Sequence, residues 1–140
     1  MTTESKNMNP YAMFETDRNL EKEGIWIDYG PFSFKVARAG GSNEKYRRML
    51  QHRMKPYRRQ IQNETMSEEK AQEIILETFV DAVLLDWKDV RDRDGNVMDF
   101  NRENALQLLS DLRDLFADLQ TQSQKIANFR REEMETDLGK

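Results

Sequence analysis

Residues 67–87, SEEKAQEIILETFVDAVLLDW, are the most apolar stretch of the chain and constrain its fold more than any other segment. Ile75 and Phe79 mark one face of a helix, and the apolar residues around them widen that face into a broad stripe. Ser67 is a suitable N-cap, because its hydroxyl can accept from the free N–H groups of the first helical turn. The pattern predicts a core helix that begins after Ser67 and ends near Trp87.

A different periodicity precedes this helix. In GIWIDYGPFSFKVARAGG, residues 24–41, apolar and polar side chains alternate on both sides of Tyr29-Gly30-Pro31, which is typical of two strands joined by a turn. We therefore predict a β-hairpin at about 24–38. Trp26 in this hairpin and Trp87 further on are expected to pack in the core rather than to form a ligand cage.

The segment between the hairpin and the core helix is basic and helical in pattern. Ser42 is a plausible N-cap for a helix over residues 43–60. Pro56 lies inside this span, and a proline cannot donate the backbone hydrogen bond that the helix requires. A kink or break is therefore expected near Lys55.

The segment DVRDRDGNVMDF, residues 89–100, resembles a calcium-binding loop at first sight. Counted from Asp92, the alternating residues Asp92, Asp94 and Asn96 and the twelfth residue, Glu103, match calcium ligands, but the sixth position of such a loop must be glycine, and here it is Val97. Asp94-Gly95 is instead a strong dipeptide for a type I′ turn. We expect a second β-hairpin at about 87–100, in which these polar residues form a turn: Asp92, Asp94, Asn96.

Helices are expected in the remainder of the chain. Asn101 can cap a helix that begins at Arg102, and a last helix follows over about residues 112–129. The fold class predicted is α+β and helix-dominated, with two small hairpins and roughly four helices. The expected organisation is a flexible N-terminal arm (1–22), a single compact domain (23–130) and a charged C-terminal tail (131–140).

Composition excludes several functional classes. The chain has no cysteine, which rules out disulfides, thiol catalysis and cysteine-based zinc sites, and no apolar run is long enough to span a membrane. The N-terminus has neither a basic n-region nor an apolar h-region, so secretion by that route is not expected. His52 is the single histidine, without a predicted catalytic partner, and Gly40-Gly41 lacks the Lys-Ser/Thr of a phosphate-binding loop. We predict no enzyme, no catalytic, metal or cofactor-binding residues, and no cofactor.

Charge is distributed unevenly. Hydrophobic residues make up 37% of the chain and charged residues 34%. This composition suits either a monomer with a small hydrophobic core or a domain that buries further apolar surface against a partner. The net charge is −4, yet residues 45–59 hold seven of the 22 Lys and Arg residues and no acid. This segment could bind an acidic helix of a partner, pair with acidic helices of its own chain, or contact nucleic acid. Nucleic acid is not an expected partner because the chain as a whole is acidic, and this pattern favours an acidic partner helix no more strongly.

Candidate partner-binding residues are those that the predicted core does not use. They lie on the basic helix and on the last helix: Lys45, Arg48, His52, Arg58, Arg59, Ile126, Phe129.

The order of these signals resembles one known family. GIWIDYG followed by FKVARAGGSNEKYRRML, and the later VLLDWKDVRDRDGNVMDFNRENALQLLSDLRDLFADLQTQSQKIANF, resemble tail assembly chaperones of long-tailed, siphovirus-type phages over about residues 24–130. The shared elements are an apolar helix ending in Trp87, the Asp94-Gly95 hairpin, and a helix that opens with Glu103-Asn104-Ala105 and closes in leucines. Arg113 stands where the family often has a proline, so the break between the last two helices is expected to be softer, or the two helices to run on.

This resemblance implies a non-enzymatic protein of the host cytoplasm that is not part of the mature virion. Its expected partner is the tape measure protein, which such chaperones keep soluble until tail tube subunits displace them. The tail tube protein, a frameshift-extended form of the chain and a homo-oligomer are further partners that the resemblance leaves open. Two alternatives remain: a structural tail or connector component, and a small nucleic-acid-binding regulator using residues 45–59.

Overall fold

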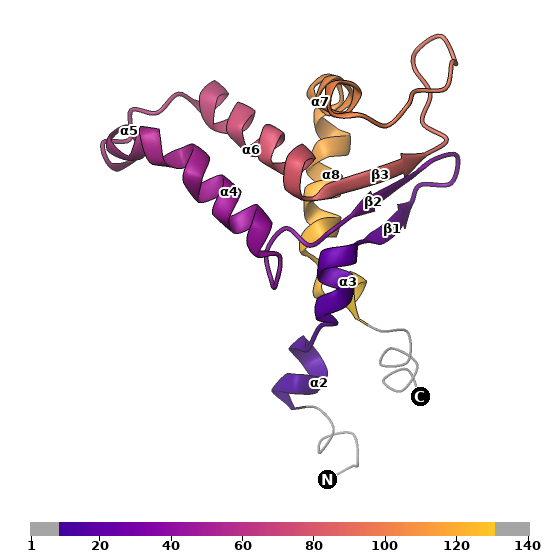
Figure 1. Cartoon of the computed structure of the whole chain (residues 1–140), viewed down its shortest axis with the longest axis horizontal. Coiled ribbons are helices and arrows are strands. Elements are labelled where there is room, and N and C mark those ends of the chain that lie inside the picture. The colour runs from indigo at the N-terminus through magenta and orange to yellow at the C-terminus, as the bar shows by residue number, and fades with distance from the viewer. Residues whose placement is uncertain (1–8, 131–140) are drawn as a thin grey trace.

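The computed structural model describes residues 9–130 and confirms the α+β, helix-dominated class. A small antiparallel sheet lies at one end of the molecule, and helices surround its inner face (Figure 1). The elements, in chain order, are α2 (Pro10–Phe14), α3 (Arg18–Glu23), β1 (Ile25–Asp28), β2 (Ser33–Val36), α4 (Glu44–Met54), the 3₁₀ turn η1 (Lys55–Tyr57), α5 (Arg58–Gln62), α6 (Glu68–Ala82), β3 (Leu84–Lys88), α7 (Arg102–Asp111), α8 (Arg113–Gln124) and the 3₁₀ turn η2 (Ile126–Phe129).

The first predicted hairpin is confirmed. β1 and β2 pair antiparallel, with Ile25 opposite Val36 and Asp28 opposite Ser33. The turn is fixed by the carboxylate of Asp28, which accepts from the backbone N–H of Gly30 at 2.7 Å. Gly30 has φ +97°, a conformation that favours glycine.

The second predicted hairpin differs from the structure, and so does the end of the core helix. α6 ends at Ala82 and does not reach Trp87, because residues from Leu84 onward form β3, which pairs antiparallel with β2. A single sheet of order β1-β2-β3 results. The apolar run suits either a helix or a strand, and the free edge of β2 offers it hydrogen-bond partners that decide in favour of the strand.

The loop after β3 keeps a reduced form of the predicted hairpin, with one isolated bridge between Arg91 and Val97. The turn is not type I′: Gly95 has φ +84°, whereas Asp94 does not have positive φ. The Asp92 carboxylate instead accepts from the backbone N–H groups of Asp94 and Asn96, both at 2.9 Å. A three-residue loop closed by a left-handed glycine is the usual alternative to the two-residue turn. The carboxylate of Asp92, which resembles a calcium ligand in the sequence, thus has a turn-forming role here.

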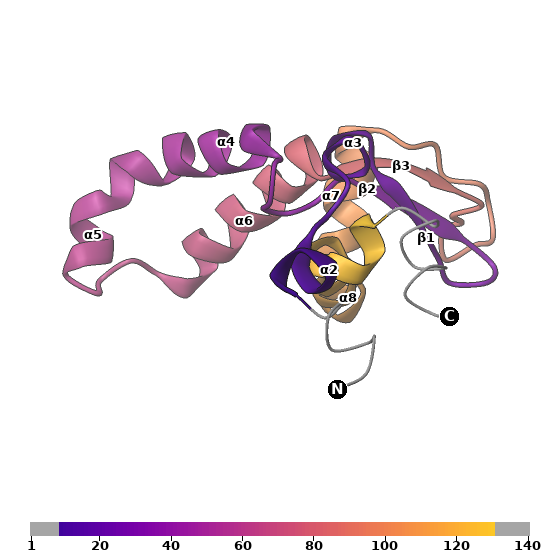
Figure 2. The same cartoon turned by 90° about the horizontal axis from the view of Figure 1, so that it is seen from below.

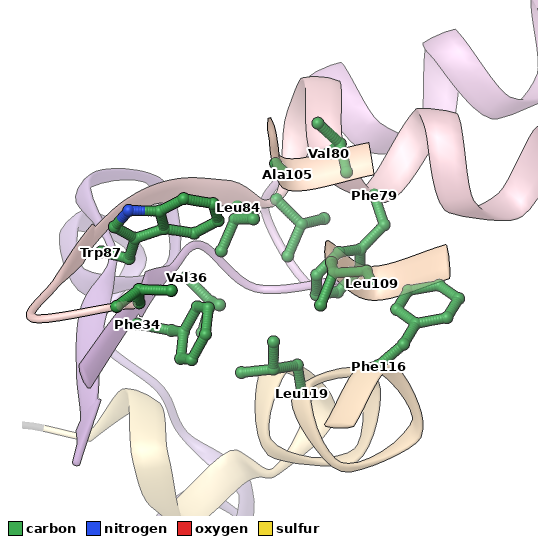
Figure 3. Close-up of a cluster of buried hydrophobic side chains, with 12 residues drawn as sticks. Phe34, Val36, Phe79, Val80, Leu84, Trp87, Ala105, Leu109, Phe116 and Leu119 are labelled. Atoms are coloured by element: carbon green, nitrogen blue, oxygen red, sulfur yellow. The ribbon is translucent and has the colours of Figure 1, made fainter. Parts of the chain in front are cut away.

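The core lies between the inner face of the sheet and three helices. Figure 3 shows Phe34 and Trp87 of the sheet facing Phe79 of α6, Leu109 of α7 and Leu119 of α8. The indole of Trp87 lies edge-on to Phe34 and donates its Nε1–H to the carbonyl of Met98 at 2.9 Å. The predicted packing role of Trp87 is therefore confirmed.

Trp26 differs from this prediction. It is 37% exposed on the outer face of the sheet, and the Lys88 ammonium lies 3.9 Å from its ring centroid. Strict alternation along β1 explains the difference, because the inward positions are taken by Ile25 and Ile27.

Helix boundaries follow the capping residues closely. Ser67 caps α6 and Asn101 caps α7, as predicted. For α4 the cap is Asn43 and not Ser42, because the side-chain Oδ1 of Asn43 accepts from the backbone N–H of Tyr46. α7 and α8 are separated at Leu112, with φ −115° and ψ 77°, so a break forms here without a proline.

Residues 9–22 of the predicted arm form helical structure and contact the end of the described chain. α2 and α3 form in this segment, and the N–H of Asp17 donates to the carbonyl of Phe129 at 2.7 Å. Arg130 also donates to the carbonyl of Ala12. The rest of the predicted arm (1–8) and the predicted C-terminal tail (131–140) lie outside the described residues.

Candidate interaction surface

The basic segment forms an arm that extends away from the body of the protein. We define the basic arm as residues 44–62, which comprise α4, η1 and α5. In Figure 2 it runs outward from the sheet, turns at α5, and is followed by α6, which runs back toward the body. The predicted break near Lys55 is confirmed, because Pro56 lies in the 3₁₀ turn between the two helices.

An acidic residue of the core helix anchors the arm. The Asp81 carboxylate on α6 accepts from Arg53 of α4 at 2.7 Å and from Arg102 of α7 at 2.7 Å. Arg53 also donates to the hydroxyl of Thr78 at 3.2 Å. Arg53 of the basic segment therefore pairs with an acid on another helix of its own chain, which is one of the three roles that the sequence left open.

Removing this anchor gives a pH-dependent loss of stability. Burial by itself would raise the pKa of Asp81, but hydrogen bonds from Arg102 and Arg53 and their positive charge hold it below the ordinary value of 3.8. A lowered pKa stabilises the folded chain above about pH 4, and this contribution is lost as the pH falls through the pKa of the folded state. We expect Asp81→Asn to lower the free energy of unfolding by about 1–2 kcal/mol at pH 7, because Arg53 and Arg102 lose an anionic partner.

This prediction is tested by urea denaturation of both proteins at pH 7 and pH 3. The difference between wild type and Asp81→Asn should shrink at the lower pH. A difference that stays constant would show that the carboxylate charge is not its source.

A groove lies where Pro56 bends the basic arm. It is mainly apolar in its lining, with Met54 and Ile61 contributing aliphatic surface, and Ile61 is 46% exposed. Cationic residues from both sides of the bend surround these side chains. We call this the bend groove, and its lining residues are Arg48, Gln51, His52, Met54, Lys55, Arg58, Ile61 and Gln62.

Most of the cations at the bend groove are uncompensated. Arg48 pairs with Glu44 of the same helix at 2.9 Å, with both side chains exposed. Within residues 9–130, no carboxylate lies within ion-pair distance of His52, Lys55 or Arg58. The groove is therefore a positively charged site in a chain of net charge −4.

The structure brings only part of the predicted partner-binding set together. Arg48, His52 and Arg58 converge on the bend groove. Lys45 lies elsewhere, in a second groove beside the start of α4, and Arg59 is exposed without lining either groove. The sequence reasoning missed Lys55 and Ile61; an isolated isoleucine in the polar segment RRQIQNET was the available signal.

Ile126 and Phe129, the two apolar candidates for partner binding, were expected to be exposed on the last helix. This expectation is wrong for Phe129. Its side chain is 0% exposed, because η2 folds back and packs beside α3. Ile126 is half-buried. The amphipathic pattern predicted one continuous helix, in which both side chains would extend beyond the core, but α8 ends at Gln124.

A second polar cluster joins α3 to the start of α4. The Glu21 carboxylate is 2% exposed and accepts from Arg38 and from the hydroxyl of Ser42, the latter at 2.8 Å. Burial favours the neutral acid, but the hydrogen bonds from Arg38 and Ser42 and the charge of Arg38 prevail, so the pKa of Glu21 lies below 4.5. Sequence patterning assigned Glu21 to a free arm and could not show this role.

Two further properties bear on what the surface can do. No group of three or more acidic or histidine side chains suited to holding a metal occurs in the part of the chain that the structure describes. Among residues 9–130, no helix combines the length and apolar character that crossing a bilayer requires.

Comparison with known proteins identifies one family. A family model described as YdaY prophage protein matches residues 41–140, which include the whole basic arm and the helices of the core. No curated protein and no solved structure matches the chain. Because the matched region covers well over half of the sequence, the chain belongs to the YdaY prophage protein family and is of phage origin.

Proposed function

We propose that this prophage protein is a non-enzymatic tail assembly chaperone, which binds the tape measure protein and keeps it soluble until tail tube subunits displace it. The observation that carries the proposal is the basic arm, which projects from the body and presents apolar side chains between uncompensated cations. The phage origin of the family and the resemblance of residues 24–130 to tail assembly chaperones support it.

The physical requirement for such a chaperone is modest. A long helical protein without its assembly partners exposes apolar stripes, which associate with one another in water. Covering such a stripe is worth about 25 cal/mol for each Å² of apolar area removed from water. A projecting two-helix arm can reach a stripe on a long partner without burying the rest of the chaperone. Tail tube subunits must later replace the chaperone, so its binding must be reversible. A small contact area makes such reversible binding possible.

In this proposal the protein acts in the host cytoplasm and leaves before the virion is complete. The experiment is co-expression with the tape measure protein of the same prophage, measuring its soluble fraction with and without this chain and testing for co-purification. We expect the tape measure protein to be soluble mainly in the complex. If its solubility is unchanged and nothing co-purifies, the proposal is wrong.

Purified particles separate this function from that of a structural tail component. A chaperone should be absent from them by mass spectrometry, whereas a tail or connector protein would be retained in fixed stoichiometry. Retention of this kind would replace the chaperone proposal by the structural alternative.

A further inference from the structure

The bend groove has a defined structural origin. Pro56 has no backbone N–H and therefore cannot continue the hydrogen bonding of α4. The chain passes through η1 and turns into α5, which places Ile61 near Met54 of the preceding helix. The bend is held from behind, because the Lys70 ammonium of α6 lies 5.8 Å from the ring centroid of Tyr57. The groove is thus formed by residues on both sides of the bend, Met54 of α4 and Ile61 of α5 among them.

Its residues select for a particular ligand chemistry. Met54 and Ile61 offer a short apolar floor, which suits one or two aliphatic or aromatic side chains of a partner. Arg48, Lys55 and Arg58 surround that floor with positive charge. A ligand that contacts both the apolar side chains and the cations of the groove must present an apolar side chain flanked by carboxylates.

An amphipathic helix can present this combination on one face, because residues three and four apart lie side by side. We propose that the bend groove binds an acidic amphipathic helix, in which an apolar residue enters the groove and Asp or Glu residues one turn away pair with Lys55 and Arg58. This proposal rests on the proposed function and names the segment of the tape measure protein that the chaperone would hold.

The apolar floor favours a protein helix over nucleic acid. A phosphate backbone would use the cations but would leave Ile61 without a partner. The net charge of −4 also weakens long-range attraction to a polyanion. A single acidic helix brings less charge and covers the apolar surface, so it matches both features of the groove.

The test uses short overlapping peptides that span the tape measure protein, each labelled with a fluorophore and titrated with the full-length protein. We expect binding to concentrate in peptides that carry an apolar stripe bordered by acidic residues. Ile61→Asp and the double variant Lys55→Glu/Arg58→Glu should each weaken the tightest peptide by roughly tenfold or more. The double variant should also lose most of the salt dependence of binding.

The chain offers a matched control on its opposite side. Val97 is exposed on the loop after β3, and Arg93 of that loop pairs only distantly with Asp111, at 4.0 Å. Val97→Asp and Arg93→Glu introduce the same chemical changes away from the bend groove and should leave peptide binding unchanged. Circular dichroism of all variants shows whether each is folded.

The outcomes distinguish this inference from the proposed function. If the groove variants bind peptides and solubilise the tape measure protein as well as wild type does, the bend groove is not the site, although the chaperone function stands. If the wild-type chain fails to solubilise the tape measure protein, the proposed function itself fails. Binding of a labelled DNA duplex that depends on the same residues, with no peptide binding, would also overturn the inference.

Discussion

Glu21→Gln is expected to lower the free energy of unfolding by about 3 kcal/mol, because removing one partner of a buried ion pair leaves the other charge uncompensated. Glu21 is 2% exposed and Arg38 is mostly buried, so water cannot take the place of the lost carboxylate. The surroundings leave little room for adjustment. A Cβ on Gly41 would stand 2.2 Å from the Glu21 carboxylate, so the loop before α4 is closely fitted to it.

A double variant separates the charge from the packing. Glu21→Gln/Arg38→Met removes both charges and should recover a large part of the loss, because a neutral pair does not require compensation. Glu23→Gln, an exposed acid of the same helix, is the matched control and should change the free energy of unfolding by less than about 0.5 kcal/mol. Urea denaturation at pH 7 measures all three. A loss for Glu21→Gln no larger than that for Glu23→Gln would show that the pair does not stabilise the fold.

The first hairpin, the break at Pro56 and the helix starts at Ser67 and Asn101 could be predicted from the sequence. Each depends on residues close together in the chain, such as a turn, a proline or a capping side chain. The phage origin could also be predicted, because the ordered set of motifs resembles a phage family. The family match supports this resemblance only at the level of a prophage protein.

The largest differences from the sequence expectation depend on contacts between distant segments, whereas the turn at Gly95 and the cap at Asn43 are local differences. Whether residues after Ala82 continue the helix or form β3 is decided by the edge of β2, about fifty residues earlier in the chain. Phe129 is buried only because η2 returns to α3, and Glu21 has a role only because it meets Arg38 and Ser42. Local periodicity contains no information about such encounters.

The bend groove illustrates both sides of this limit. Pro56 and the basic residues were visible in the sequence, and Arg48 and His52 lie on one helix, α4, as predicted, whereas Arg58 lies on α5. The contribution of Ile61 was not visible, since it depends on how α5 turns after η1. An isolated apolar residue in a polar segment becomes informative only when its neighbours in space are known.

The second large effect is expected in the core. Phe79→Ala should lower the free energy of unfolding by about 4 kcal/mol, because deleting a buried aromatic side chain removes its transfer free energy and leaves a cavity. Phe79 is 1% exposed and meets Phe116 of α8 edge-on, with ring centroids 5.2 Å apart (Figure 3). It comes from α6, the helix that carries both the core and the anchor of the basic arm.

Phe14→Ala is the matched control, since Phe14 is the same residue type but 61% exposed, and it should cost less than about 0.5 kcal/mol. The comparison also tests how stability and partner binding are related. If the bend groove depends only on residues 48–62, folded Phe79→Ala protein should bind its helix with unchanged affinity at temperatures well below its midpoint of unfolding. Weaker binding by the folded variant would mean that the position of the arm depends on the packing of α6 against α8, so that the core itself sets the shape of the groove.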